Sequence, residues 1–229
     1  MGILSKKTNN LLQSLSFIFK RDSRPYYEFS LLTSENFSSP DYYRFCNRWL
    51  ERYLEFCPSC NRLVYVYNKS GDAAIRNNST KEGISLPSHR KKGSSIVTGS
   101  AFGFDPKSED YKVVRFVDKC ITGEEVEDKD EQDCRSGVEL YSFKSNSWKW
   151  ISDFERVFFS PSIYLKGPSV YVNGRSFWKR GRVIVSFDFA DEEFSRLNLP
   201  DIGKSAAEQK RLYGFDLLEF DGSLAAVVY

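Results

Sequence analysis

Short runs rich in apolar and aromatic residues recur along most of the chain, and turn-forming residues separate them. In one example Val170–Val172 precedes Asn173-Gly174, the strongest short signal for a β-hairpin, and the aromatic run Arg175–Trp178 follows. Similar runs lie at residues 26–32, 63–67, 101–104, 111–117, 138–143, 148–151, 183–189 and 217–220. Runs of this length between turns are typical of strands. The pattern predicts an all-β fold, either a sandwich, a barrel or a propeller.

A faint internal repeat favours the propeller among these three architectures. The strand-turn-strand unit at Val138 recurs 45 residues later at Val183, and the turn Asn173-Gly174 recurs 48 residues later as Asp221-Gly222. Four-stranded propeller blades repeat with a period of about 40 to 50 residues. We therefore expect about four blades between Asn61 and the end of the chain.

Two segments near the N-terminus depart from the strand pattern. The first predicts a short helix, since its apolar residues fall on one helical face: Leu11, Leu12, Leu15, Ile18 and Phe19. We therefore divide the chain into an N-terminal helical segment, residues 1–24, and a β-propeller-like domain, residues 25–229. The second segment, residues 41–56, has aromatic residues and leucines at spacings typical of both helix and strand, so it could form a helix or two short strands.

Charge is unevenly placed along the chain. Residues 124–133 carry seven acidic side chains and one basic one, so self-repulsion predicts an extended, solvated loop. A tolerated surface insertion is the favoured interpretation of this loop, and docking of a basic partner is the alternative. A basic cluster follows Ser88-His89. The candidate protein-binding residues from these two clusters are Arg90, Lys91, Lys92, Glu124, Glu125, Glu127 and Asp128.

The composition narrows the classes of partner and compartment. Lysine and arginine total 33 against 31 acidic residues, a net charge of +2, so nucleic acid is not an expected partner. No stretch approaches the roughly 20 apolar residues that span a bilayer, and the N-terminus lacks the apolar core of a signal peptide. We therefore expect no membrane partner, and a cytoplasmic or nuclear protein.

The five cysteines do not predict a disulfide framework, because their number is odd and no signal peptide accompanies them. Cys57 and Cys60 have the spacing of a zinc knuckle or a redox pair. A zinc site would need two further ligands, and no second close cysteine pair or histidine-rich tract supplies them. Buried or half-exposed strand thiols are the favoured interpretation, and we expect neither a metal nor a cofactor.

No constellation of catalytic residues is visible. His89 is the single histidine, it lies among basic residues, and no GxSxG motif accompanies it. The carboxylates Asp191–Glu193 fall in a predicted turn, where solvation is the ordinary explanation. Trp148 and Trp150 alternate along a predicted strand, so they point the same way, and packing between blades is favoured over an exposed binding face. The sequence therefore predicts a binding protein rather than an enzyme.

Several sequence segments resemble those of a known protein family, and they occur in the same order and with similar spacing. The strings at residues 101–117 (AFGFDPKSEDYKVVRFV), 138–151 (VELYSFKSNSWKWI), 170–179 (VYVNGRSFWK) and 183–200 (VIVSFDFADEEFSRLNLP) are similar to the plant F-box-associated domain. The earlier strings SCNRLVYVYN and RNNSTKEGISLP look like two further phrases of that family, although Arg62 and Asn78 replace its usual glycine and proline. Kelch-like and S-locus-type F-box proteins have the most similar phrasing.

This resemblance implies a β-propeller of the kelch type that selects a target protein for ubiquitination by an SCF-type (cullin–RING) E3 ubiquitin ligase. In complete members an N-terminal F-box binds a Skp-type adaptor and through it the cullin, so these two partners are expected only if an F-box lies upstream. Here Leu11–Lys20 resembles only the segment that follows an F-box, and the sequence near Tyr229 looks like a strand after which members continue.

We therefore expect a chain truncated at both ends, with an incomplete ring of about four blades that is weakly soluble or self-associates. The alternative function is a stand-alone or truncated protein-interaction module without coupling to the adaptor. A third hypothesis, a sugar-acting or oxidase-type propeller enzyme, would need metal ligands or carboxylates at the ring centre and rests on fold analogy alone.

Overall fold

The structure is a computed structural model of the chain, and every regular element in its described residues is a β-strand. It describes residues 16–23, 26–33, 41–45, 55–61, 63–77, 82–88, 95–119, 137–153, 169–181, 183–198 and 215–228. The chain divides into two compact units, Met1–Glu51 and Arg52–Tyr229. The all-β prediction is confirmed.

In the part of the first unit that the structure describes, the strands form one antiparallel sheet with the order β1-β2-β3. Its strands are β1 (Ser16–Ser23), β2 (Tyr26–Thr33) and β3 (Asp41–Phe45). The predicted helix is wrong from residue 16 onward, because β1 pairs with β2 along all of its eight residues. A short apolar run does not distinguish helix from strand by its period alone, and here a pairing partner follows directly along the chain.

The rest of that helix prediction, residues 11–15, lies outside the described residues. A segment boundary at residue 24 stays a prediction, although β1 and β2 lie on either side of it and share one sheet. The ambiguous stretch at residues 41–56 begins with β3 and ends inside β4 (Glu55–Cys60), which agrees with the two-strand alternative.

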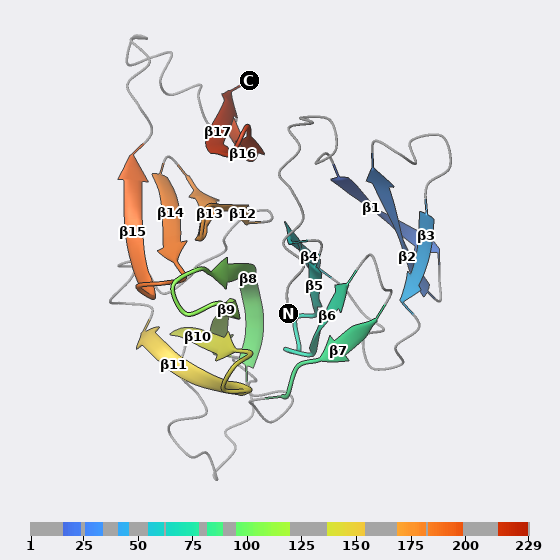
Figure 1. Ribbon diagram of the computed structural model, residues 1–229, viewed down its shortest axis with the longest axis horizontal. Helices are drawn as coiled ribbons and strands as arrows, with labels where there is room; N and C mark the ends of the chain where they lie inside the picture. The colour runs from blue at the N-terminus through green and yellow to red at the C-terminus, as the bar shows by residue number, and fades with distance from the viewer. Residues whose placement is uncertain are drawn as a thin grey trace, which may run out of the picture. The chain divides into compact units, whose positions relative to one another are not determined.

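The described residues of the second unit form three four-stranded antiparallel sheets and a hairpin, which we call blades I to IV in chain order (Figure 1). Blade I consists of β4 (Glu55–Cys60), β5 (Leu63–Tyr67), β6 (Ala73–Asn77) and β7 (Gly83–Ser85). Blade II consists of β8 (Ser95–Asp105), β9 (Asp110–Lys119), β10 (Gly137–Ser142) and β11 (Ser147–Asp153). Blade III consists of β12 (Val170–Val172), β13 (Arg175–Arg180), β14 (Val183–Asp188) and β15 (Glu193–Asn198). Blade IV contains β16 (Phe215–Phe220) and β17 (Ser223–Val228).

The blades explain the sequence repeat. Val138 and Val183 both lie at the start of the third strand of a blade, in β10 and β14. Asn173-Gly174 and Asp221-Gly222 both connect the first strand of a blade to the second. The first strands β4, β8 and β12 contact one another, and β12 also contacts β16. Sheets that converge on their first strands in this way are propeller blades.

Apolar clusters fill the space between neighbouring blades, so most strands are covered on both faces. Successive residues of β9 alternate between two clusters, with Val113 in the cluster between blades I and II and Val114 in the cluster between blades II and III. A third cluster joins Phe177 of blade III to Phe215 of blade IV. Burial on both faces explains why strands such as Val183–Asp188 are nearly continuous apolar runs.

Strand direction alternates within each meander, so the turns from first to second strand and from third to fourth strand lie at the same edge of the blades. We call this the turn edge. In the described residues every non-glycine residue with positive φ lies in one of these turns: Asn61, Glu109, Asn146, Asn173, Glu192 and Asp221. Asparagine and aspartate tolerate this left-handed conformation better than most residues, which explains why the turns are rich in them.

Candidate protein-binding site

The charged residues predicted as candidate contacts lie outside the described residues. This holds for Arg90, Lys91 and Lys92, and for the acidic residues Glu124, Glu125, Glu127 and Asp128. They stay predictions, as does the prediction for His89 and for the solvated loop at residues 124–133.

The turn edge is cross-linked between blades by side-chain hydrogen bonds. Asn61 of blade I donates through Nδ2 to the hydroxyl of Tyr111 of blade II at 3.1 Å. Asn173 of blade III donates through Nδ2 to the carbonyl oxygen of Gly222 of blade IV at 2.8 Å. Tyr171 of blade III donates to the carbonyl oxygen of Phe104 of blade II at 2.9 Å. These bonds hold neighbouring turns in fixed relative positions.

Lys112 makes the densest of these connections, between blades II and III. Its ammonium group is buried and donates to Asp105 at 2.8 Å, to the carbonyl oxygen of Phe189 at 2.9 Å and to Glu192 at 3.0 Å. Burial alone would raise the pKa of Asp105, but hydrogen bonds from Lys112 and Ser108 outweigh it and hold that pKa well below its usual range. The group is fully partnered, so it serves as a structural link between the blades.

A second buried ion pair stabilises the interface of blades I and II. Arg115 donates through Nε to Glu139 at 2.7 Å, and the two residues are directly opposite each other on β9 and β10. The guanidinium also donates to the carbonyl oxygen of Gly71 at 3.2 Å and lies 3.8 Å from the centre of the Trp148 ring. Every one of these contacts is structural, and none leaves a charge facing solvent.

The tryptophan pair packs where the sequence predicted. Trp148 and Trp150 both pack on the apolar cluster between blades I and II, and Trp148 donates through Nε1 to the carbonyl oxygen of Pro87 at 2.8 Å. Their interpretation as residues packed between blades is confirmed. They do not form an exposed binding face.

The cysteine pair is buried in β4. Cys57 and Cys60 are each 2% exposed and free, and Cys57 donates through Sγ to the carbonyl oxygen of Ser100 at 3.2 Å. Burial raises the pKa of the Cys57 thiol to about 12 and that of Cys60 to about 11. The interpretation as buried strand thiols is confirmed for these two residues, because both lie in β4 and are almost fully buried.

The described residues contain no group of three or more histidine, cysteine or acidic side chains that could hold a metal ion. Likewise, the described part of the chain includes no helix with the length and apolar character needed to cross a membrane. What the described residues do offer is an apolar cavity, between blades I and II at the turn edge.

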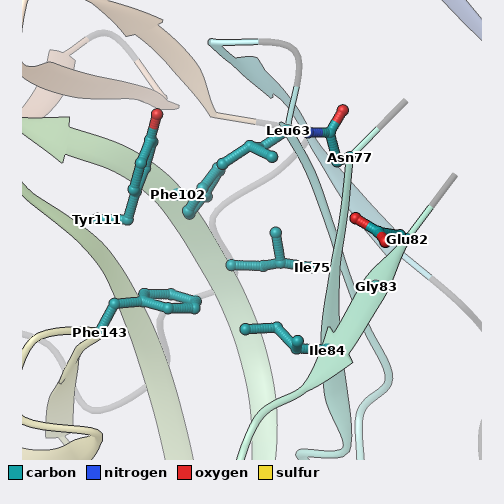
Figure 2. A pocket seen from close by; sticks show the side chains of 9 residues that line it. All are labelled: Leu63, Ile75, Asn77, Glu82, Gly83, Ile84, Phe102, Tyr111 and Phe143. Carbon is teal, nitrogen blue, oxygen red and sulfur yellow. The ribbon is translucent and has the colours of Figure 1, made fainter. Parts of the chain in front are cut away.

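The cavity has a volume of about 250 Å³ and an almost wholly apolar lining. Blade I contributes one wall and blade II the other (Figure 2). Its lining residues are Leu63, Ile75, Asn77, Glu82, Gly83, Ile84, Phe102, Tyr111 and Phe143. Figure 2 shows the side chains of Ile75 and Ile84 pointing across the cavity toward the ring of Phe143.

The aromatic wall of the cavity is held rigidly by ring contacts. The rings of Phe102 and Tyr111 stack with their centroids 5.7 Å apart, and Phe143 meets Tyr111 edge-on at 6.5 Å. The hydroxyl of Tyr111 points away from the cavity, where it accepts the bond from Asn61 (Figure 2). The opposite wall ends at Ile84, which is 55% exposed. This arrangement can take up an apolar group from solvent.

Sequence reasoning missed this cavity. Leu63 and Phe143 are 80 positions apart, and each resembles an ordinary strand residue when considered alone. One available signal was Ile84, an apolar residue beside glycine in a short polar segment. It could not be interpreted without knowing that blade II lies beside it.

Comparison with known proteins agrees with this architecture. The family model for the F-box associated beta propeller domain matches residues 14–229. F-box protein CPR1 of Arabidopsis thaliana is 31% identical over 164 residues, which cover 62% of this chain and 38% of that relative. The matched region thus spans well under half of the relative's length. Since the family match extends over nearly the whole sequence, from before β1 to the last residue, the chain belongs to the F-box associated beta propeller family.

Proposed function

We propose that this chain is the substrate-recognition component of an SCF-type cullin–RING E3 ubiquitin ligase and binds a target protein through its propeller. The match to the F-box associated family over residues 14–229 carries the proposal, and the similarity to an F-box protein supports it. The described blades provide a rigid binding scaffold, with tight turns cross-linked along one edge and an apolar cavity beside them. The chain's own role is to bring target and ligase together.

Affinity purification of the full chain from plant cells treated with a proteasome inhibitor tests this proposal. The expected result is a complex that contains a Skp-type adaptor, a cullin and at least one further protein that carries ubiquitin conjugates. Recovery of a target protein without adaptor or cullin would favour the interaction module that acts alone. Recovery of neither would contradict the proposal, provided that the purified chain gives the circular dichroism of a folded β-protein.

A further inference from the structure

The outer edge of blade I lies directly beside the apolar cavity. β7 is the last strand of the order β4-β5-β6-β7, so no described strand pairs with its outer side. Its three residues, Gly83–Ser85, are all exposed. An outer strand with free backbone groups can accept another extended chain by hydrogen bonding.

The register of β7 shows which of its backbone groups face outward. Asn77 donates its N–H to the carbonyl oxygen of Glu82 at 2.8 Å, and Leu86 donates to that of Ala73 at 2.9 Å. Ile84 lies between these bonds and pairs with Ile75. Because bonding alternates along an antiparallel strand, the N–H and C=O groups of Gly83 and Ser85 point away from β6.

The side chains of this edge present an apolar row that ends at the cavity. Ile75 and Ile84 are opposite each other and point to the same face of the sheet, toward Phe143 of blade II (Figure 2). A chain paired to Gly83 and Ser85 would place the residue opposite Ile84 next in this row. Its side chain would therefore reach the outer mouth of the cavity between Ile84 and Phe143.

The lining of the cavity selects the kind of side chain. An almost wholly apolar lining would leave a polar or charged group without hydrogen-bond partners, which is costly. A volume of about 250 Å³ exceeds the roughly 150 Å³ of an engineered apolar cavity that binds benzene. The cavity therefore suits a large apolar side chain, and its aromatic wall favours an aromatic one.

The exposed side chain of Glu82 adds a preference for charge. Glu82 lies two residues before Ile84, so it is on the same face of β7, and Figure 2 shows it at the edge of the cavity. A bound chain that runs antiparallel to β7 has its apolar residue opposite Ile84. The residue two positions further along that chain is then opposite Glu82. A basic residue at that position is favoured, because opposite charges directly across two strands attract.

We propose that blade I docks an extended segment of the target protein along β7, with one aromatic or large aliphatic side chain in the cavity and a basic residue opposite Glu82. The inference rests on the proposed function and specifies how the target is recognised. The two peptide residues that flank the apolar one make the backbone bonds to Gly83 and Ser85. The segment thus has the pattern apolar, any residue, basic, in an otherwise extended conformation.

A titration of the full chain with one defined peptide tests this docking mode. The probe is acetyl-Ser-Thr-Val-Thr-Phe-Thr-Lys-Thr-Ser-amide, and the readout is the NMR signal of the isoleucine δ1-methyl groups. We expect shifts at Ile75 and Ile84 and none at Ile184, which lies in the cluster between blades III and IV. Replacing the phenylalanine of the peptide by alanine should weaken binding about 10- to 100-fold, as the loss of one buried aromatic side chain implies.

Matched variants separate docking at this site from general adhesion. Ile84→Asp should weaken binding at least about tenfold, whereas Leu197→Asp should not, although Leu197 is a 42% exposed apolar residue on the fourth strand of blade III. Glu82→Lys should weaken the lysine peptide and strengthen a peptide with glutamate in its place. Methylation of the backbone nitrogen after the phenylalanine should abolish binding, and methylation of the nitrogen of the phenylalanine itself should not.

Several results would overturn the docking proposal. They are an absence of shifts at Ile75 and Ile84, equal affinity for the alanine peptide, or equal effects of Ile84→Asp and Leu197→Asp. The titration requires neither adaptor nor ligase, so its failure is distinct from failure of the proposed function. A chain that recruits cullin and a ubiquitinated target but ignores the peptide would be a ligase receptor that binds its target elsewhere.

Discussion

Removing the buried guanidinium of Arg115 should destabilise the second unit strongly. The side chain of Glu139 is 0% exposed, and Arg115→Met leaves it without its guanidinium partner at 2.7 Å. The variant also loses the bond to Gly71 and the contact with the ring of Trp148. Breaking a buried pair by removing one partner costs about 3 to 5 kcal/mol, because the remaining charge stays desolvated.

This cost is large compared with the total stability of a domain, which is about 5 to 15 kcal/mol. For a chain of this size it corresponds to a fall in Tm of about 6 to 20 °C, at about 2 to 4 °C per kcal/mol. Urea unfolding followed by tryptophan fluorescence measures the free energy of unfolding directly, since Trp148 lies against the pair. Differential scanning calorimetry gives the accompanying change in Tm.

The matched control is Arg175→Met. Arg175 donates through Nε to Asp188 at 2.8 Å, nearly the same geometry, but its side chain is 53% exposed. An exposed pair contributes about 0 to 1 kcal/mol, so this variant should unfold almost like the parent. The double variant Arg115→Met/Glu139→Leu should recover most of the lost stability, because it also removes the buried carboxylate of Glu139. Equal losses in the free energy of unfolding for Arg115→Met and Arg175→Met would show that burial does not set the contribution of the Arg115–Glu139 pair.

Three further predictions concern the same interfaces. The free energy of unfolding should fall as the pH drops below about 4.5. The pKa values of Asp105 and Glu192 in the folded chain lie below their ordinary 3.8 and 4.5, so the two carboxylates stabilise the fold while they are charged. That stabilisation is lost as they become protonated. In an acid titration monitored by circular dichroism, the stability of Lys112→Met should depend less on pH than that of the parent chain. Identical titration curves would contradict the role of Lys112 in lowering these two pKa values. Gly103→Ala should lower the free energy of unfolding, measured in urea, by about 1 to 3 kcal/mol, because the added Cβ would lie 2.3 Å from the ring of Phe189. Unchanged stability would show that this ring can move aside. Cys57 and Cys60 should not react with iodoacetamide at pH 8 until urea unfolds the chain, because their raised pKa values keep both thiols protonated. Rapid labelling of these two residues in the folded chain would contradict their burial.

Local chemistry explains which parts of the fold were predictable. Asn173-Gly174 sets a hairpin by itself, and its recurrence as Asp221-Gly222 reflects equivalent turns in successive blades. The alternation of Trp148 and Trp150 likewise follows from the pleat of one strand. By contrast, the apolar run at Ile18 and Phe19 fits both helix and strand, and pairing with β2 decides between them.

The features that were missed depend on two blades lying side by side. Charged residues such as Arg115 and Lys112 are normally solvated. Their partners within blade II are completed by a neighbouring blade, through the carbonyl oxygen of Gly71 for Arg115 and through Glu192 for Lys112. The cavity has the same origin, since Phe143 and Ile84 become its two walls only when blade II lies beside blade I. Spacing within one segment contains no such information.

Quantitative proteomics of ubiquitin-remnant peptides tests the proposal that this chain selects a protein for ubiquitination. Plant cells with induced full chain are compared with uninduced cells, both treated with a proteasome inhibitor. We expect that a protein which co-purifies with the chain gains ubiquitin sites on induction and has a shorter half-life when the inhibitor is omitted. Unchanged ubiquitination and half-life for every co-purifying protein would contradict it.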